Sequence, residues 1–233
     1  MKPIIFFRKF HKWLGLIIGL QLLLWVVGGF VMSFFDIEEV RGEHRIAEQS
    51  QADLSQPISI TVDEAIASSG LIPEEVQLKS WLGSAVWLIS QGEKKALVNA
   101  QTGELISPLD EGTARRVANA DYSGNESIQQ VQLIQEPLGE VRGKTLPLWQ
   151  VTFTDDDATR LYISQQSGEV VARRNDTWRL FDFFWMLHIM DYKDRTDFNN
   201  PLLVIAALLA ILMSLSGLYL VIKLIFFKPK RPR

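Results

Sequence analysis

The sequence contains no cysteine among its 233 residues. That absence excludes disulfides, thiolate metal sites and a cysteine nucleophile, and it is compatible with either a reducing or an oxidising compartment. Acidic residues are missing from both ends, because no Asp or Glu precedes Asp36 or follows Asp197. The usual catalytic signatures are missing as well: there is no G-x-S-x-G, no H-E-x-x-H, no P-loop and no dinucleotide-binding glycine fingerprint.

Charge is distributed unevenly along the chain. The total is −3, yet the two acid-free ends carry nine cations, and removing those nine leaves the middle of the chain at −12. A segment that acidic repels phosphates, so nucleic acid is not an expected partner. The nine cations are Lys2, Arg8, Lys9, Lys12, Lys223, Lys228, Lys230, Arg231 and Arg233.

Two long apolar stretches predict membrane-spanning helices at residues 13–35 and 201–223. A helix of about 20 residues crosses the hydrocarbon core of a bilayer. Asn200 is suited to cap the second helix, and Pro201 to open its first turn. A cleaved signal peptide is the alternative for the first stretch. Its apolar region would be about 7–15 residues long and end in an A-x-A-like site, which favours a retained span here.

The cations predict the orientation of both spans. Short basic flanks stay in the cytoplasm, so the tails at residues 1–12 and 224–233 are expected there. Residues 36–200 then lie on the far side of the membrane, which is the periplasm if the host membrane is a bacterial inner membrane. The lipid bilayer is therefore one expected partner.

Small and polar residues inside the spans point to helix packing. Gly15 and Gly19 form a small-xxx-small pair, and Ser214 and Gly217 are small residues of the second span. Such residues allow close approach of helices, within one chain or in a homodimer, although they are also common in membrane helices generally. Gln21 lies in mid-span, where its amide needs a hydrogen-bond partner on a neighbouring helix.

Residues 57–110 and 111–175 repeat the same pattern after a linker at 36–56. Each copy begins with a helix-like stretch, "TVDEAIASSG" or "EGTARRVANA", and continues with strand-like stretches that end in "VNAQTGEL" or "ISQQSGEV". Thr61 and Glu64 have the spacing of a capping box. Gly103 aligns with Gly168, and turns at both positions suit a residue that tolerates positive φ. The second copy carries an additional hairpin extension, "PLGEVRGKTLP".

A further helix is predicted at residues 176–192, capped by Asp176 or Thr177. On a helical wheel His188 lies opposite Arg179, on a face that carries the aromatic residues Phe181, Phe184 and Trp185. Tryptophan favours membrane interfaces, so this helix is expected at the membrane surface or against the domain between the spans. His188 would then hydrogen-bond to backbone or to a lipid headgroup.

The repeats resemble PepSY units, in which one helix packs on a small antiparallel sheet and a strand ends in a turn of the "D/N-A-x-T-G-E" type. The flanking stretches "FHKWLGLIIGLQLLLWVVGGFVMSF", "VRGEH" and "WRLFDFFWMLHIMDYKDRTDFNNPLL" resemble the PepSY-associated transmembrane family. The resemblance covers nearly the whole chain. It implies an α+β fold of two tandem PepSY-like units between two transmembrane helices, whereas larger family members have about four spans.

The resemblance implies a non-enzymatic accessory module that binds a protein partner in envelope iron or redox physiology. A peptidase is one such partner, because PepSY units are associated with restraining peptidases. The alternative is a haem-binding electron carrier, or a subunit of a ferric-siderophore-type membrane reductase. A third hypothesis is a structural anchor for a larger complex.

The alternative makes His188, His44 and His11 candidate ligands of haem b, since haem iron accepts axial imidazole. His11 and His188 are expected on opposite membrane faces, about 30 Å apart, so one haem cannot bridge them. His44 and His188 are expected on the same face and could share one iron. A homodimer could instead pair His11 with its own copy.

Overall fold

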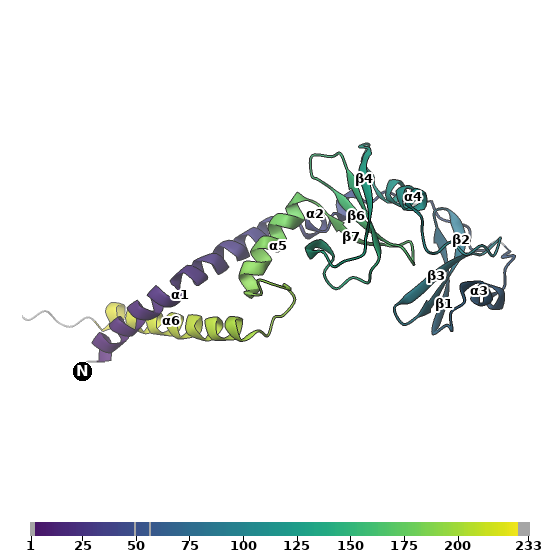
Figure 1. The fold of residues 1–233 in the computed structure, drawn as a ribbon. Helices are drawn as coiled ribbons and strands as arrows, with labels where there is room; N and C mark the ends of the chain where they lie inside the picture. Colours follow the sequence, from purple (N-terminus) through teal and green to yellow (C-terminus); the bar gives the residue numbers. More distant parts are fainter. Residues whose placement is uncertain (1–2, 49, 56, 228–233) are drawn as a thin grey trace, which may run out of the picture. The chain divides into compact units, whose positions relative to one another are not determined.

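The computed structural model describes residues 3–48, 50–55 and 57–227, and the chain divides into two compact units. Residues 1–35 and 180–233 form the helical unit, and residues 36–179 form the sheet unit. Four cations of the expected C-terminal tail and Lys2 lie outside the described residues. The fold mixes helices and strands: a long apolar helix lies at each end of the chain, and the residues between these helices in the sequence form two small antiparallel sheets (Figure 1).

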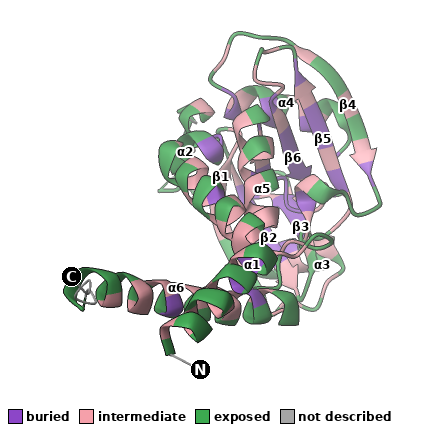
Figure 2. Ribbon diagram, turned by 90° about the vertical axis from the view of Figure 1, so that its left-hand side faces the viewer, coloured by how far each residue is buried: buried purple, intermediate pink, exposed green. Residues whose placement is uncertain are grey.

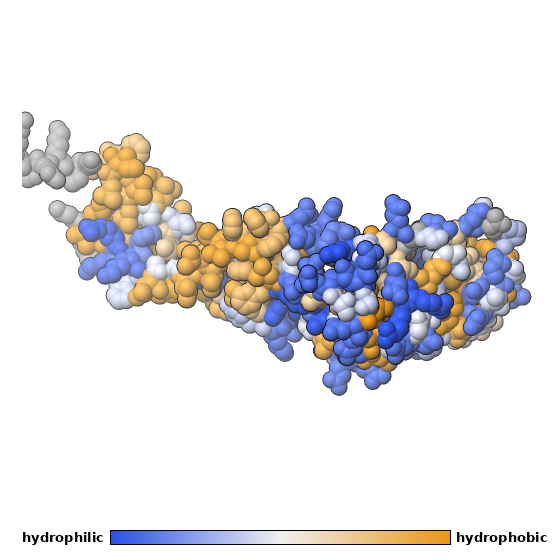
Figure 3. Space-filling view, turned by 90° about the horizontal axis from the view of Figure 1, so that it is seen from above, coloured by the Kyte–Doolittle hydropathy of each residue, from blue (hydrophilic) through white to orange (hydrophobic). Residues whose placement is uncertain are grey.

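The helical unit consists of α1 (Pro3–Phe34), α6 (Pro201–Phe226) and the second part of α5 (Asp176–Ile189). α1 and α6 pack against each other, and both are long and apolar enough to cross a membrane. Their residues are mostly exposed in Figure 2, and they form the hydrophobic part of the surface in Figure 3. Apolar surface of this extent is compatible with lipid rather than water, which makes this a membrane protein.

The start of α6 has the predicted cap. Asn200 accepts a hydrogen bond from the backbone N–H of Leu203 at 2.9 Å, and Pro201 occupies the first turn. α1 begins at Pro3, ten residues before the expected span, because "PIIFFRKFHK" continues the helix without a breaker. The small-xxx-small prediction holds only in part. A side chain at Gly15 would meet Met213, and one at Gly217 would meet His11, whereas Gly19 has open space around it.

The first half of the sheet unit contains α3 (Val62–Ser69), β1 (Glu75–Trp81), β2 (Ser84–Gln91) and β3 (Lys94–Asn99). The predicted capping box is present: Glu64 donates its backbone N–H to Thr61, and its carboxylate accepts from the Thr61 N–H. The strands pair in the order β1-β2-β3, and α3 packs on β2 and β3.

The second half contains α4 (Glu111–Asp121), β4 (Ile128–Ile134), β5 (Leu148–Phe153), β6 (Arg160–Ser164) and β7 (Val170–Arg174). These strands pair in the order β4-β5-β6-β7, and α4 packs on them. The predicted extension connects β4 to β5 and contains a short 3-10 helix (Gly139–Val141). Two further short helices, Ile37–Val40 and Glu43–Arg45, occupy the expected linker.

The two halves share one hydrophobic core. Val86 and Leu97 of the first half cluster with Val117, Val151 and Phe153 of the second half. All five side chains are at most 5% exposed. Burial of this kind is the main stabilising contribution to folding, so we expect the halves to fold together.

The turns that contain Gly103 and Gly168 have the same geometry. Gly103 has a φ of 74° and donates its N–H to the carbonyl of Asn99 at 2.9 Å. Gly168 has a φ of 66° and donates to Ser164 at 3.0 Å. One residue beyond each glycine, the carbonyl of the glutamate accepts from Asn99 or Ser164 in turn, in both cases at 2.9 Å. Positive φ explains why glycine stands at both positions.

Candidate functional site

The three candidate histidines lie in three different surroundings. His44 is exposed in the short 3-10 helix of the sheet unit. His11 and His188 both belong to the helical unit, on α1 and in the last turn of α5. The predicted pairing of His44 with His188 joins residues of different units and stays a prediction.

His188 has an imidazole nitrogen that is buried without a partner. Its Nδ1 has no hydrogen bond to any described residue. The expected bond from this nitrogen to backbone is therefore not seen. The ring packs near Trp25 of α1, with 6.2 Å between the ring centroids, and Trp185 packs against Phe198. The aromatic neighbour from α1 could not be read from the helical wheel of α5 alone.

Side chains of α1 and α6 cap the end of α5. Gln21 donates to the carbonyl of Leu187 at 3.2 Å, and Trp25 donates to that of His188 at 2.9 Å. Asn200 donates to the carbonyl of Ile189 at 2.9 Å. The last carbonyls of a helix have no hydrogen-bond donor within the helix, so these three side chains supply the missing donors at the end of α5. The prediction that Gln21 bonds a neighbouring helix is confirmed.

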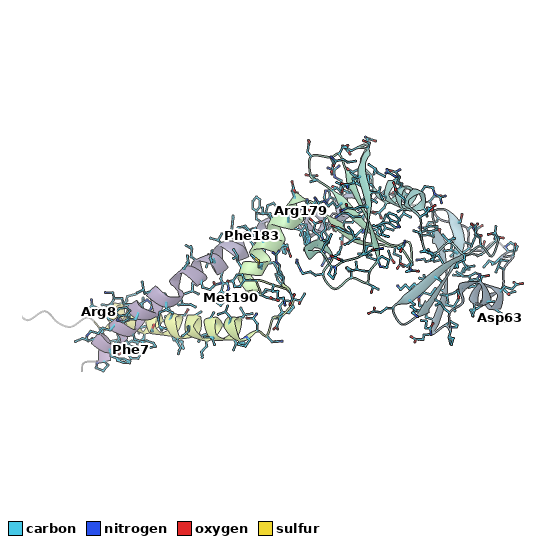
Figure 4. All side chains as sticks on the ribbon, viewed as in Figure 1. Phe7, Arg8, Asp63, Arg179, Phe183 and Met190 are labelled. Atoms are coloured by element: carbon cyan, nitrogen blue, oxygen red, sulfur yellow. The ribbon has the colours of Figure 1, made fainter. Side chains whose placement is uncertain are left out.

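α5 begins at Asp176, as predicted, but ends at Ile189, three residues before the predicted end. Asn175 caps it, accepting from the backbone N–H of Trp178 at 2.7 Å, so the proposed caps Asp176 and Thr177 are wrong. Figure 4 labels Arg179 near the start of the helix and Met190 just beyond its end. Met190 has a φ of 55°, a left-handed conformation that ends the helix.

His11 links the two long helices. Its Nδ1 lies 2.9 Å from the hydroxyl of Ser216 and 3.2 Å from the carbonyl of Met213. A Cβ on Gly217 would approach the ring to 3.0 Å, so the glycine permits this close contact. Polar contacts of this kind between membrane helices contribute about 0.6 kcal/mol on average, which favours a packing role for His11.

A groove lies at the surface of the sheet unit, between the β2–β3 turn and the β4–β5 connection. It consists of two adjoining depressions of ≈ 520 and ≈ 390 Å³, which share Glu93, Lys95, Leu146 and Pro147, and Glu169 also lines the smaller one. Lys94 lines the larger depression, and Lys144 lines the smaller. We call it the basic groove and define it by Lys94, Lys95, Ala96, Lys144, Leu146 and Pro147.

Residues 8–233 match the model of the PepSY-associated TM region family. The chain belongs to the PepSY-associated TM family. A search of curated proteins found no match, and neither did a search of solved structures. Membership covers almost the whole chain and confirms the resemblance drawn from its motifs.

Haem, the cofactor that the resemblance implies, fits this PepSY-associated TM protein only in part. His188 offers one imidazole with an unpartnered buried nitrogen. His11 cannot join it on one iron, because Trp25, which lies beside His188, is 14 residues from His11 along α1. That is about 21 Å of helix. The distance is shorter than the expected separation of about 30 Å, but it is too long for both imidazoles to bind one iron. His188 therefore offers a single imidazole nitrogen to a haem iron, and His11 does not offer a second one to the same iron.

Glu169 lines the smaller depression of the basic groove and forms ion pairs with two lysines. Its carboxylate lies 2.9 Å from the ammonium of Lys79 and 3.6 Å from that of Lys95, and it accepts from the hydroxyl of Ser167. Burial alone would raise the pKa of Glu169, but the hydrogen bond and charge of Lys79 outweigh it and lower the pKa. Its counterpart Glu104, at the matching turn, takes no part in an ion pair with any described residue.

Glu140 organises a second polar network that sequence patterns did not reveal. Its carboxylate accepts from Arg160 at 3.0 Å, from Arg179 at 2.9 Å and from the hydroxyl of Tyr162 at 2.7 Å. Burial alone would raise the pKa of Glu140, but these donors and the charge of the two arginines lower it. Burial and the bond to Glu140 raise the pKa of Tyr162 to about 12. The network fixes the β4–β5 connection over its sheet and holds the first turn of α5.

Proposed function

We propose that this PepSY-associated TM protein is a membrane-anchored binding module whose sheet unit holds a partner protein. The role is accessory, in envelope iron or redox physiology. The observation that supports it is a local reversal of charge. The sheet unit carries 13 Lys and Arg against 23 Asp and Glu, a net charge of −10. At the basic groove, by contrast, Lys94, Lys95 and Lys144 outnumber Glu93 and Glu169, which leaves one positive charge in excess.

Two of those lysines are available to a partner. Lys94 and Lys144 are exposed and form no ion pair with a described residue, whereas Lys95 lies near Glu169. The apolar side chains of Leu146 and Pro147 lie between them. Apolar surface beside a few well-placed charges is typical of protein-binding sites, since the first supplies affinity and the second orients the partner.

The matching turns support two tandem PepSY-like units. Gly103 and Gly168 share their φ region and their hydrogen bonds, and each turn follows a helix and an antiparallel sheet in the same order. The proposal fits a duplicated unit whose second copy has gained β7 and the β4–β5 connection.

We place the protein in a bacterial inner membrane with both termini in the cytoplasm. The uneven distribution of cations supports this orientation. Reporter fusions test it. A periplasm-dependent reporter is expected to be active at Ala120, and a cytoplasm-dependent reporter at the C-terminus; the opposite pattern would overturn the orientation.

Charge reversal in the basic groove tests partner binding. Full-length tagged protein is purified from membranes of the source cells after in-cell crosslinking, and the partner is quantified against the wild type. Lys94→Glu with Lys144→Glu is expected to reduce the retained partner about tenfold. The matched control is Arg41→Glu with Arg115→Glu, which makes the same change of charge outside the groove. Equal retention by both double variants would reject the groove as the binding site.

A haem-binding electron carrier is the second candidate function, and the buried, unpartnered Nδ1 of His188 favours it. A bound haem would supply one-electron chemistry; His188 would hold its iron, and Trp25 packs near the imidazole of His188. An absorbance spectrum and a pyridine haemochrome assay of the protein from haem-replete cells test this. A Soret band that His188→Ala removes supports the candidate, and a colourless folded protein rejects it.

A further inference from the structure

After the matching turns at Gly103 and Gly168, the second sheet gains a further strand, whereas the first sheet does not. After the matching turns, Val98 pairs with Leu105 in the first half, as Ile163 pairs with Val170 in the second. In the second half the chain then extends as β7 along the whole of β6, to the pair Arg160–Arg174.

In the first half the pairing ends almost at once. The N–H of Ile106 donates to the carbonyl of Leu97 at 2.8 Å, and the chain then leaves the strand. Pro108 has no N–H with which to continue a ladder, and Leu109 donates instead to Gln165 of the second half at 2.7 Å. The first sheet therefore has three strands and the beginning of a fourth.

The backbone of Lys95 faces this open edge. Leu97 uses its carbonyl for Ile106, and its N–H for the hydroxyl of Ser107, on the side of β3 away from β2. Backbone groups alternate in direction along a strand, so the N–H and C=O of Lys95, two residues earlier, point to the same side. β3 is the last strand of its sheet, and among the described residues no strand pairs with Lys95 there.

The larger depression of the basic groove lies along this edge. Leu71 and Ala96 line it on the side of α3, and Leu146 and Pro147 line it on the side of the second half. Its charged lining residues are Glu93, Lys94 and Lys95, which leaves one positive charge in excess. Its volume of ≈ 520 Å³ is within the range of ligand-binding pockets. In the second half, the later part of β7 pairs with β6. The depression occupies the corresponding place in the first half, beside β3.

We propose that this open edge accepts an extended, acidic segment of the partner protein as a fourth strand, antiparallel to β3. The proposal rests on the proposed function, because the partner supplies the segment. Strand addition provides main-chain hydrogen bonds, here to Lys95, while alternate side chains provide specificity. Apolar residues of the segment contact Leu71 and Leu146, and its carboxylates pair with Lys94 and Lys144.

A defined peptide tests the chemistry on the full-length protein in detergent. The probe is a fluorescently labelled heptapeptide of alternating valine and glutamate, measured by fluorescence anisotropy. An analogue with N-methyl groups on alternate amides keeps the side chains but loses the main-chain donors. It is expected to bind about tenfold more weakly, and the lysine version of the peptide more weakly still. No binding of the parent peptide, or equal binding of the N-methylated analogue, would overturn the proposal.

Variants at Lys95 test the same bond from the protein side. Lys95→Pro removes the outward N–H and is compatible with an edge strand, while Lys95→Ala removes only the side chain. Peptide affinity is expected to fall about tenfold in the first variant relative to the second, with unchanged urea midpoints. Equal affinities reject strand addition, and a wild-type dimer that Lys95→Pro converts to a monomer would show that a second copy occupies the edge.

The two proposals can fail separately. If Lys95→Pro loses the peptide but the crosslinked partner is retained, the strand proposal falls and the binding module survives. If neither the partner nor the peptide responds to charge reversal at Lys94 and Lys144, both proposals fall.

Discussion

Gly168→Ala is expected to destabilise the sheet unit more than the same substitution at two other turns. A Cβ at Gly168 would lie 2.8 Å from Cζ2 and from Nε1 of Trp81, closer than side chains tolerate. The indole would have to move, although its Nε1–H donates to the carbonyl of Gly168 at 3.0 Å. At Gly103 the nearest atom is Cδ1 of Ile60, the flexible end of a side chain, at 3.2 Å, and at Gly92 no atom lies within 4 Å.

The magnitude follows from two contributions. All three glycines have positive φ, for which alanine costs roughly 1–2 kcal/mol. Loss of the Trp81–Gly168 hydrogen bond adds about 0.5–1.5 kcal/mol. We therefore expect about 1.5–3.5 kcal/mol for Gly168→Ala and about 1–2 kcal/mol for Gly92→Ala, with Gly103→Ala between them.

Urea unfolding of the full-length protein, followed by tryptophan fluorescence, measures these differences. Trp81→Phe provides the partner for a double-mutant cycle, because a smaller ring leaves room for the new Cβ. The additional penalty at Gly168 should then shrink by about 1 kcal/mol. Equal destabilisation at all three glycines, or no coupling with Trp81→Phe, would refute the reasoning.

Three further predictions concern other contacts. Glu140 has a lowered pKa when folded, so its stabilisation is present above the unfolded pKa near 4.5 and is lost as pH falls. Glu140→Gln should cost about 3 kcal/mol at pH 7 and flatten the acid side of the stability profile; an unchanged profile in urea titrations contradicts this. Gly217→Leu should lower the melting temperature in detergent, because it displaces His11, whereas Gly19→Leu should not. If haem is bound, His188→Ala should remove its Soret band and His11→Ala should leave it, and the reverse result would exclude His188 as ligand.

Much of the fold could be predicted because the signals are local. The two apolar helices follow from the length of uncharged sequence, and the caps at Thr61 and Asn200 follow from residue types at fixed spacing. The turns at Gly103 and Gly168 were marked by repetition of one motif sixty-five residues apart. Each of these features depends on a few neighbouring residues, so the sequence contains what is needed.

The site was less predictable because it depends on long-range contacts. Trp25 lies 163 positions from His188 in the chain, and no periodicity on α5 could indicate it. Glu140 belongs to a connection that could be read only as an extension, yet its partners come from β6 and from the start of α5. The backbone of Lys95 has no strand partner on its outer side among the described residues, and no local motif in the sequence could indicate this.

The caps of α5 have a consequence for the order in which the protein assembles. In a bilayer, each backbone carbonyl must find a partner within the protein. Gln21 and Trp25 precede α5 in synthesis, so they are in place when its last turn emerges. Asn200 follows it and caps both the end of α5 and the start of α6. One side chain therefore satisfies both helix ends, and if Asn200 becomes part of the chain's structure last, we expect the end of α5 to gain its third capping bond as the first turn of α6 forms.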